Sequence, residues 1–218
     1  MRDGDIHAAI HILRRATRAW TTPYVTDLAQ RARDPFSVLI STMLSLRTKD
    51  AVTGIASQKL FALADTPRAL LKLTPRQIEK AIYPVGFYRI KARNILKVCR
   101  VLVEQYNGNV PDEIDALVTL HGVGRKTANL VVTLGFGKPG ICVDTHVHRI
   151  TNRWGYVKTK TPEQTEMALR EKLPRAYWIE INDELVALGQ NICHPTSPKC
   201  SLCPLSQYCA RVGVTRSR

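Results

Sequence analysis

The chain has 218 residues and a hydrophobic content of 44%, which is enough for a core in one large domain or two small ones. Its 32 Lys and Arg residues outnumber 18 Asp and Glu residues, and the formal charge of +14 favours a polyanionic partner, although acidic membranes or ribosomes would also attract it. No apolar run is long enough to span a bilayer, and the start, MRDGDIHAAI, lacks the layout of a signal peptide. From these features we expect a cytoplasmic protein, associated with the nucleoid if the source is bacterial.

An amphipathic helix is predicted near the start, over residues 6–20. Its apolar positions recur at helical spacing and are Ile6, Ile10, Leu13 and Trp20. Its polar positions include three basic residues, Arg14, Arg15 and Arg18. The favoured interpretation of this basic face is a solvated surface, and a contact with a polyanion is the alternative.

Several further helices are predicted to begin at a polar residue followed by proline. The polar side chain caps the first turn, and proline fits the first helical position. In two cases a glutamine three residues after the cap completes a capping box. The starts are Asp34–Pro35, Thr66–Pro67, Thr74–Pro75 with Gln77, and Thr161–Pro162 with Gln164. Since alternating β-branched runs are scarce between them, the sequence predicts an all-α protein in which the apolar segment 36–46 is central.

Residues 120–144, LHGVGRKTANLVVTLGFGKPGICVD, contain a tight turn between two helices. Asp112 and Asp115 mark the start of the first helix. Gly122 and Gly124 permit positive φ on both sides of Val123, which is expected to point back between the helices. The N–H groups of the turn and of the second helix lack intrahelical partners, so they can hold a phosphate.

Lys126 lies in the first turn of the second helix, which is otherwise apolar. The neighbouring Arg125 and the positive end of the helix dipole both favour a neutral amine, which is the nucleophilic form. The same turn also fits a purely structural hairpin with a solvated lysine. The turn by itself therefore does not decide between a catalytic and a structural role.

Four of the six cysteines lie near the end of the chain, as Cys193, Cys200, Cys203 and Cys209. In a cytosolic protein such a group indicates a metal site rather than disulfides, whereas Cys99 and Cys142 have apolar neighbours and are expected in the core. Four thiolates bind either zinc or a [4Fe-4S] cluster. Zinc ribbons usually have two Cys-x2-Cys pairs, and this chain has one such pair flanked by wider gaps.

The run Leu-x-Gly-x-Gly-Arg-Lys-Thr-Ala, with Val-Asp-Thr-His at 143–146, resembles the helix-hairpin-helix DNA glycosylases, most closely the endonuclease III branch. The resemblance covers nearly the whole chain. It implies that Lys126 attacks the sugar C1′ of a damaged nucleotide and that Asp144 assists; Asp144 is also a candidate N-cap for a helix over residues 145–153. The residues implied in DNA binding around these two are Gly122, Val123, Gly124, Arg125, Thr127 and His146.

The cysteine spacing C-x6-C-x2-C-x5-C is similar to the iron-sulfur loop of the endonuclease III family, which implies a [4Fe-4S] cofactor. Relatives often have more basic residues in the first gap, where this chain has HPTSPK with only His194 and Lys199. The basic residues that bind DNA are therefore expected elsewhere. A run without an acidic residue over 86–100 offers Arg89, Lys91, Arg93, Lys97 and Arg100.

The resemblance also implies how the predicted helices are arranged in space, which the periodicity of the sequence does not indicate. It implies a two-domain, all-α helix-hairpin-helix glycosylase fold. A helical barrel domain over 24–138 would contain the hairpin at about 112–135. Residues 1–23 and 139–218 would form an iron-sulfur cluster domain with the cluster loop at 193–209. The active cleft would run between these domains.

Two positions match the family residues that enter DNA when a nucleotide is flipped out of the stack. Phe87 corresponds to a wedge that is often leucine in relatives, and an aromatic ring suits that role. Arg47 stands where the family usually has a glutamine beside the orphaned base. From the residues alone, the alternatives are a core position for Phe87, which is the favoured interpretation of that residue, and a surface position for Arg47.

The function implied is a base-excision-repair DNA glycosylase with AP lyase activity, which removes oxidised pyrimidines through a Schiff base on Lys126. We expect a monomer that binds damaged or abasic duplex DNA and no membrane. A thymine, uracil or adenine glycosylase of the same fold is an alternative, as are a non-catalytic DNA-binding module and a ferredoxin-like electron carrier. Incubation with abasic duplex DNA separates the lyase from the non-catalytic module.

Overall fold

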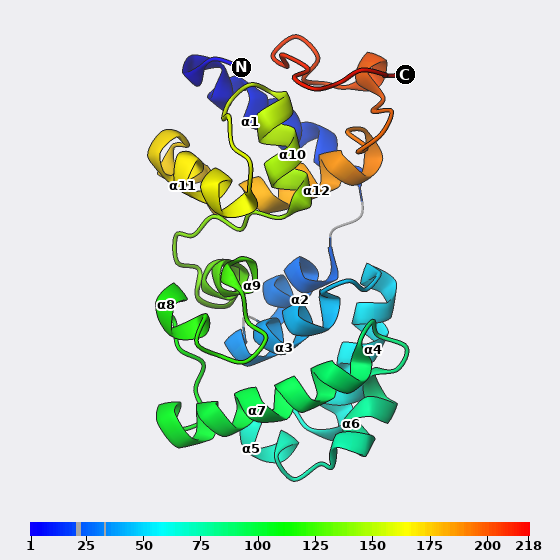
Figure 1. Cartoon of the computed structure of the whole chain (residues 1–218), viewed down its shortest axis with the longest axis vertical. Helices are drawn as coiled ribbons and strands as arrows, with labels where there is room; N and C mark the ends of the chain where they lie inside the picture. Colours follow the sequence, from blue (N-terminus) through cyan, green and yellow to red (C-terminus); the bar gives the residue numbers. More distant parts are fainter. Residues whose placement is uncertain (21–22, 33) are drawn as a thin grey trace. The chain divides into compact units, whose positions relative to one another are not determined.

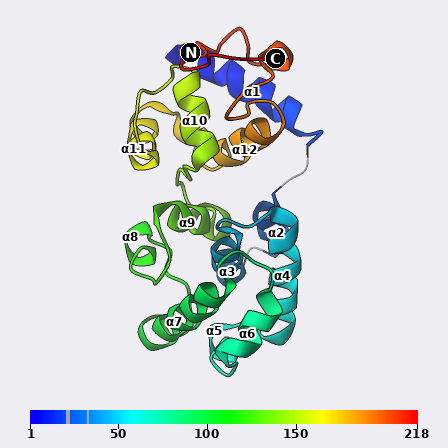
Figure 2. The same cartoon turned by 45° about the vertical axis from the view of Figure 1, so that its right-hand side comes forward.

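The computed structural model describes residues 1–20, 23–32 and 34–218, and no strand occurs within these ranges. The predicted all-α fold class is confirmed. The chain forms two compact units, which are visible in Figures 1 and 2: residues 23–138, and the described residues of 1–22 and 139–218. No described helix is long and apolar enough to cross a membrane.

The unit of residues 23–138 is built around one buried helix, α3 (Pro35–Ser45), as predicted for the apolar segment. The other helices of this unit are α2 (Tyr24–Ala32), α4 (Asp50–Leu63), α5 (Pro67–Leu70), α6 (Pro75–Ile82), α7 (Tyr88–Tyr106), α8 (Ile114–Leu117) and α9 (Arg125–Leu130), which continues into the π-helical turn η2 (Val131–Gly135). Helix α3 packs against α2, α4, α7, α9 and η2. A Cβ added at Gly135 would lie 3.0 Å from Pro35 Cα, so η2 fits closely against the start of α3.

The predicted polar-proline starts are all present in the structure. Asp34 accepts hydrogen bonds from the backbone N–H groups of Phe36 and Ser37, and Thr66 and Thr161 cap α5 and α11 (Pro162–Lys172) in the same manner. Thr74 and Gln77 form the full capping box of α6. The capping box predicted at α11 is not formed, because the Gln164 side chain accepts from Lys160 N at 2.9 Å instead of from the backbone of the N-cap Thr161.

Two expectations about the region before the hairpin are wrong. Asp112 does not open α8, because its carboxylate pairs with Lys138 Nζ at 2.7 Å and the helix begins at Ile114. Gly122 has the expected positive φ of 78°, but Gly124 is extended, with φ −94° and ψ 174°. Gly124 is the N-cap of α9, a position that has non-helical dihedral angles without requiring positive φ.

The second unit contains the N-terminal helix and the helices after residue 139. Its elements are η1 (Asp3–Asp5), α1 (Ile6–Thr17), α10 (Thr145–Arg153), α11 (Pro162–Lys172), η3 (Arg175–Tyr177), α12 (Ile181–Asn191) and η4 (Cys200–Leu202). Helix α12 packs against both α1 and α10, as Figure 2 shows. The core of this unit includes Ile10, Leu13, Ile150, Leu185 and Leu188.

Helix α1 is shorter than predicted and part of its basic face is used within the unit. The helix ends at Thr17, so Trp20 lies beyond it. Arg14 donates from Nε and Nη2 to the two carboxylate oxygens of Glu180, at 2.7 and 2.6 Å. This two-bond ion pair anchors α1 to the start of α12, and it takes Arg14 out of the set of charges available to a polyanion.

Candidate active site

The hairpin turn between α8 and α9 is fixed by Val123. Its side chain is buried, and its backbone N–H donates to Leu120 O at 3.0 Å. At Gly122 a Cβ would lie 2.8 Å from Asn94 Nδ2 of α7, so the turn sits closely on that helix. Gly124 has no atom within 4 Å of its Cβ position and no side chain caps α9. The first backbone N–H groups of α9 are therefore next to an open position at Gly124, from which an anion can approach them.

Lys126 is the second residue of α9 and is half-buried. The helix presents a buried side to the core through Ala128 and Leu130, which fixes the orientation of the turn that carries the lysine. Thr127, the next residue, is only 1% exposed. Its side chain is therefore buried, and its backbone amide, in the first turn, is the part of Thr127 that belongs to the possible anion site.

Asp144 caps α10, as predicted. Its Oδ1 accepts from His146 N at 2.8 Å and from Val147 N at 2.9 Å, and the residue is half-buried. Neither of these two hydrogen bonds uses Oδ2. A carboxylate can thus cap the helix through one oxygen and present the other to a reacting group.

His146 is turned toward its own unit. Its Nδ1 lies 3.1 Å from Arg149 Nη2 and it packs so closely on Gly189 of α12 that a Cβ there would overlap the ring. His148 instead contacts Thr165 Oγ1 through Nδ1 at 2.7 Å. The two histidines therefore have different partners, which is consistent with their placement on different faces of α10.

Arg47 and Phe87 lie together, although they are far apart in the sequence. The Arg47 guanidinium carbon lies 5.6 Å from the centre of the Phe87 ring. Both side chains are exposed, Phe87 by 57%. Both residues also have positive φ, 54° and 58°, which is uncommon for residues other than glycine. The exposed Phe87 ring excludes the interpretation that it is a core residue.

Most of the predicted basic run forms one exposed stripe on α7. Arg89, Arg93, Lys97 and Arg100 are exposed and recur every three or four residues, so they share one face of the helix. Lys97 Nζ lies 3.2 Å from His121 Nε2 of the hairpin turn. The basic stripe therefore borders the hairpin turn within the same unit.

Lys91 does not belong to this stripe, which corrects the expectation from the sequence. It is 8% exposed, and its ammonium donates to Leu44 O at 2.7 Å and Leu46 O at 2.6 Å, at the end of α3. The last carbonyls of a helix lack intrahelical partners, and a cation satisfies them. Burial lowers the pKa of Lys91 to about 8.

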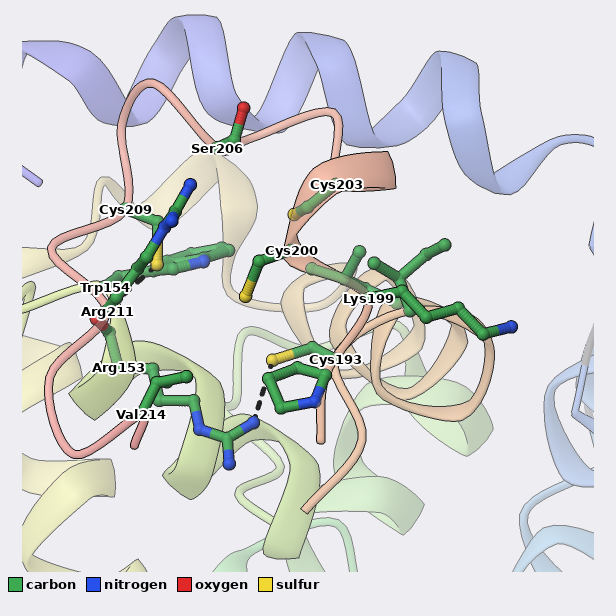
Figure 3. Close-up of a pocket in the computed structure, with 13 residues that line it drawn as sticks. Arg153, Trp154, Cys193, Lys199, Cys200, Cys203, Ser206, Cys209, Arg211 and Val214 are labelled. Atoms are coloured by element: carbon green, nitrogen blue, oxygen red, sulfur yellow. Dashed lines mark hydrogen bonds between the residues drawn. The ribbon is translucent and has the colours of Figure 1, made fainter. Parts of the chain in front are cut away.

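The four clustered cysteines line one pocket (Figure 3). Cys193 follows α12, Cys200 begins η4, and Cys203 and Cys209 come from the loop after it. In Figure 3 the sulfur atoms of Cys193, Cys200 and Cys209 point into the space between them. The rest of the wall is largely apolar and includes Trp154, Leu188, Ile192 and Val214.

Arg153 connects α10 to this pocket. It is 9% exposed, and its Nη1 donates to Cys193 Sγ at 3.3 Å and to His194 O at 2.7 Å. Its own carbonyl accepts from Val212 N at 3.0 Å. Arg153 thus ties both ends of the cysteine loop to the helical core, one through its guanidinium and the other through its carbonyl, and the guanidinium places positive charge beside a thiol.

The thiols fit an iron-sulfur cluster. Burial raises the pKa of Cys203 to about 11 and also raises the pKa of Cys209, so bound metal must supply the positive charge that holds them as thiolates. A [4Fe-4S] cluster takes one thiolate for each iron, from cysteines spread around it.

Comparison with known proteins agrees with this site. Residues 40–175 match the HhH-GPD superfamily of base excision DNA repair proteins, and residues 193–209 match the iron-sulfur binding domain of endonuclease III. Endonuclease III of Thermotoga maritima is 52% identical over 176 residues, which cover 81% of this chain and 83% of that protein.

Two solved structures have the same fold. A trapped covalent intermediate of endonuclease III with DNA, an estranged-adenine complex, has a TM-score of 0.86 at 33% identity and covers 97% of both chains. A thermostable thymine-DNA glycosylase has a TM-score of 0.81 at 25% identity, covering 94% of this chain and 95% of that one.

The chain belongs to the endonuclease III family of base excision DNA repair proteins. It is accordingly a DNA glycosylase with AP lyase activity that binds DNA, and its four C-terminal cysteines form the [4Fe-4S] site of the family.

Sequence reasoning missed three contributors to these sites. Arg153 and Trp154 line the cysteine pocket but lie about forty residues before Cys193. Thr48 accepts hydrogen bonds from Lys91 Nζ and Gly86 N, at 3.2 and 3.1 Å. No local motif indicates such partners, because the contacts join helices and loops that are distant in the chain.

Proposed function

We propose that this enzyme excises oxidised pyrimidines from duplex DNA as a monomer, with Lys126 as the nucleophile and Asp144 as the assisting carboxylate. The observation that carries the proposal is the position of Lys126 in the first turn of the helix after the hairpin, beside the open backbone of Gly124. A lysine at this position lies close to any phosphate held by the turn, and hence close to the sugar of a bound nucleotide.

DNA binding is attributed to the hairpin amides and the basic stripe on α7. The stripe of Arg89, Arg93, Lys97 and Arg100 borders the hairpin turn, where Lys97 contacts His121. Side chains of this type neutralise backbone phosphates without reading sequence. This suits a repair enzyme, which must act wherever a lesion occurs.

The target nucleotide must leave the stack before its sugar can be attacked. We assign Phe87 to fill the vacated space and Arg47 to face the orphaned base. The exposed ring, the contact between the two side chains and their positive φ angles support this assignment. Apolar and aromatic wedges are commonly used to hold an unstacked step open.

The reaction proceeds by covalent catalysis. The neutral Lys126 amine attacks C1′, the N-glycosidic bond breaks, and the base leaves with the bonding electrons and a proton. Loss of an amine proton and opening of the sugar ring give a Schiff base. Removal of a C2′ proton then expels the 3′ phosphate by β-elimination. Asp144 stabilises positive charge at the sugar and assists the proton transfers. The [4Fe-4S] cluster, when bound to its four cysteines, holds the C-terminal loop together.

Borohydride trapping on thymine-glycol and abasic duplexes tests this proposal. Wild-type protein should form a covalent complex with both substrates. Lys126→Gln should still bind but should not be trapped, whereas the exposed helical lysine variant Lys80→Gln, which loses the same charge, should be trapped like the wild type. Trapping that persists in Lys126→Gln would exclude this lysine as the nucleophile.

The similarity to a thymine-DNA glycosylase makes excision of mismatched thymine a second candidate activity. Duplexes that each contain one oxidised pyrimidine, one thymine opposite guanine or one uracil distinguish the candidates. Faster single-turnover release of oxidised pyrimidines supports the proposal, and faster release of mismatched thymine supports the alternative.

A further inference from the structure

The loops that carry Arg47 and Phe87 approach each other unusually closely. A Cβ added at Gly86 would lie 2.5 Å from Arg47 O, so only glycine fits there. Gly86 N donates to Thr48 Oγ1 at 3.1 Å. The two loops are thus joined next to the exposed Arg47 and Phe87 side chains, by the close approach of Gly86 to the Arg47 backbone and by the Thr48 hydroxyl.

The Thr48 hydroxyl has all of its hydrogen-bonding capacity in use. It accepts from Gly86 N and from Lys91 Nζ, and it donates to Leu46 O at 3.3 Å. A hydroxyl has one proton to donate and two lone pairs to accept with. Thr48 therefore links the loop of Arg47, the loop of Phe87 and the buried lysine at a single atom.

The Lys91 ammonium is matched to its surroundings in the same way. Its three N–H donors face three acceptors, the carbonyls of Leu44 and Leu46 and the hydroxyl of Thr48. Lys91 is also one helical turn after Phe87, and its backbone N–H donates to Phe87 O at 3.0 Å. Lys91 therefore contacts the backbone of both loops: that of Leu46, next to Arg47, and that of Phe87 itself.

We propose that Lys91 and Thr48 are positioning residues that hold Arg47 and Phe87 as one preformed unit, so that both enter the DNA stack together when a nucleotide is flipped. The proposal rests on the wedge role given to Arg47 and Phe87 above. Neither Lys91 nor Thr48 touches the DNA in this role. Their effect is to remove the cost of ordering two loops at the moment of flipping.

The substitutions Thr48→Val and Thr48→Ser form a matched pair. Valine keeps the shape of threonine and removes the hydroxyl, whereas serine keeps the hydroxyl and removes a methyl group. Thr48→Val removes all three hydrogen bonds of the hydroxyl and should slow single-turnover base excision from duplex DNA by roughly tenfold or more, and Thr48→Ser should restore most of the rate. Lys91→Met should act in the same direction as Thr48→Val.

A single-stranded abasic oligonucleotide provides the control for general damage. It has no orphaned base and no stack to hold open, so cleavage of it requires Lys126 but not the wedge. Cleavage of this substrate should be unchanged in Thr48→Val. Equal losses on duplex and single-stranded substrates would overturn the positioning role, as would unchanged duplex excision in both Thr48→Val and Lys91→Met.

A double-mutant cycle then tests whether Thr48 acts through the wedge. In a Phe87→Ala background, Thr48→Val should cause almost no further loss of duplex excision. Full additivity of the two losses would overturn the proposal. A wild-type protein without activity on either substrate would instead refute the proposed function, so the two failures give different results.

Discussion

Asp144 combines a structural and a chemical role in one carboxylate, and the two can be separated by substitution. Asparagine caps helices about as well as aspartate but carries no charge. Asp144→Asn should therefore keep the free energy of unfolding within about 0.5 kcal/mol of the wild type, while Asp144→Ala should lower it by about 0.5–2 kcal/mol. Both variants should lose roughly 10²-fold or more in excision rate. Denaturant titration and single-turnover kinetics measure the two effects. An Asp144→Asn enzyme with full activity would limit Asp144 to the cap.

Arg47 gives a prediction about the base opposite the lesion. An arginine offers five donors and no acceptor, which suits the O6 and N7 acceptors of guanine better than the mixed edge of adenine. A lesion opposite guanine should be excised faster than the same lesion opposite adenine, by a margin of about 1 to 3 kcal/mol in activation free energy.

Arg47→Gln should narrow this difference, and Arg47→Ala should slow excision opposite both purines. Excision rates for the paired duplexes under single-turnover conditions give the measurement. Equal rates opposite both purines, unaffected by either substitution, would mean that the opposite base is read by other residues.

At the scale of elements, the buried Cys99 of α7 makes the unfolding free energy of the protein depend on pH in the alkaline range. The thiol is fully buried, and burial raises its pKa from 9.0 to about 12. Between these values the unfolded thiol is ionised and the folded thiol is not, so the unfolding free energy falls as pH rises. Lys91, whose pKa is lowered from 10.5 to about 8, has the opposite effect between pH 8 and 10.5.

The comparison of the wild type with Cys99→Val isolates the effect of Cys99. Both proteins retain Lys91, so its contribution cancels in the difference between their unfolding free energies. The destabilisation caused by Cys99→Val should be smaller at pH 10 than at pH 8. Urea titration at the two pH values measures it. If the difference in unfolding free energy between the two proteins is the same at both pH values, the pKa of Cys99 is not raised by burial.

The helices whose signals are local were predicted correctly from the sequence. The caps at Asp34, Thr66, Thr74, Thr161 and Asp144 all lie within three residues of the groups they bind, so the sequence contains the whole interaction. The predictions for Asp112 and Lys91 failed for a common reason. Each depends on a partner or a packed surface from another element, such as Lys138 for Asp112 and the end of α3 for Lys91.

For the whole molecule, the charge of +14 predicts binding to DNA that weakens steeply with salt. Removing one phosphate contact should lower the slope of log K against log salt by about 1. Arg93→Ala and Lys97→Ala on the α7 stripe should each have this effect, and Lys80→Ala on α6 should not. Fluorescence anisotropy with an undamaged duplex measures the slopes. Equal slopes in all variants would place the DNA-binding surface elsewhere.

The [4Fe-4S] cluster also affects the folding of the whole molecule, because its four cysteine ligands hold the C-terminal loop together. Purified protein should be brown and contain about four iron and four sulfide per chain. Cys203→Ser should yield little soluble protein, since the loop then loses one of its four attachments to the cluster. Metal analysis and solubility measure both expectations. A colourless protein with about one zinc per chain would contradict the iron-sulfur assignment.

The central claim is that the amine which attacks the sugar is that of Lys126. The most direct measurement is to reduce the Schiff base with borohydride, digest the protein and the DNA, and locate the sugar adduct by mass spectrometry. The adduct should lie on Lys126, in the peptide that follows the hairpin turn. An adduct on the amino group of Met1, or on any other lysine, would contradict the account.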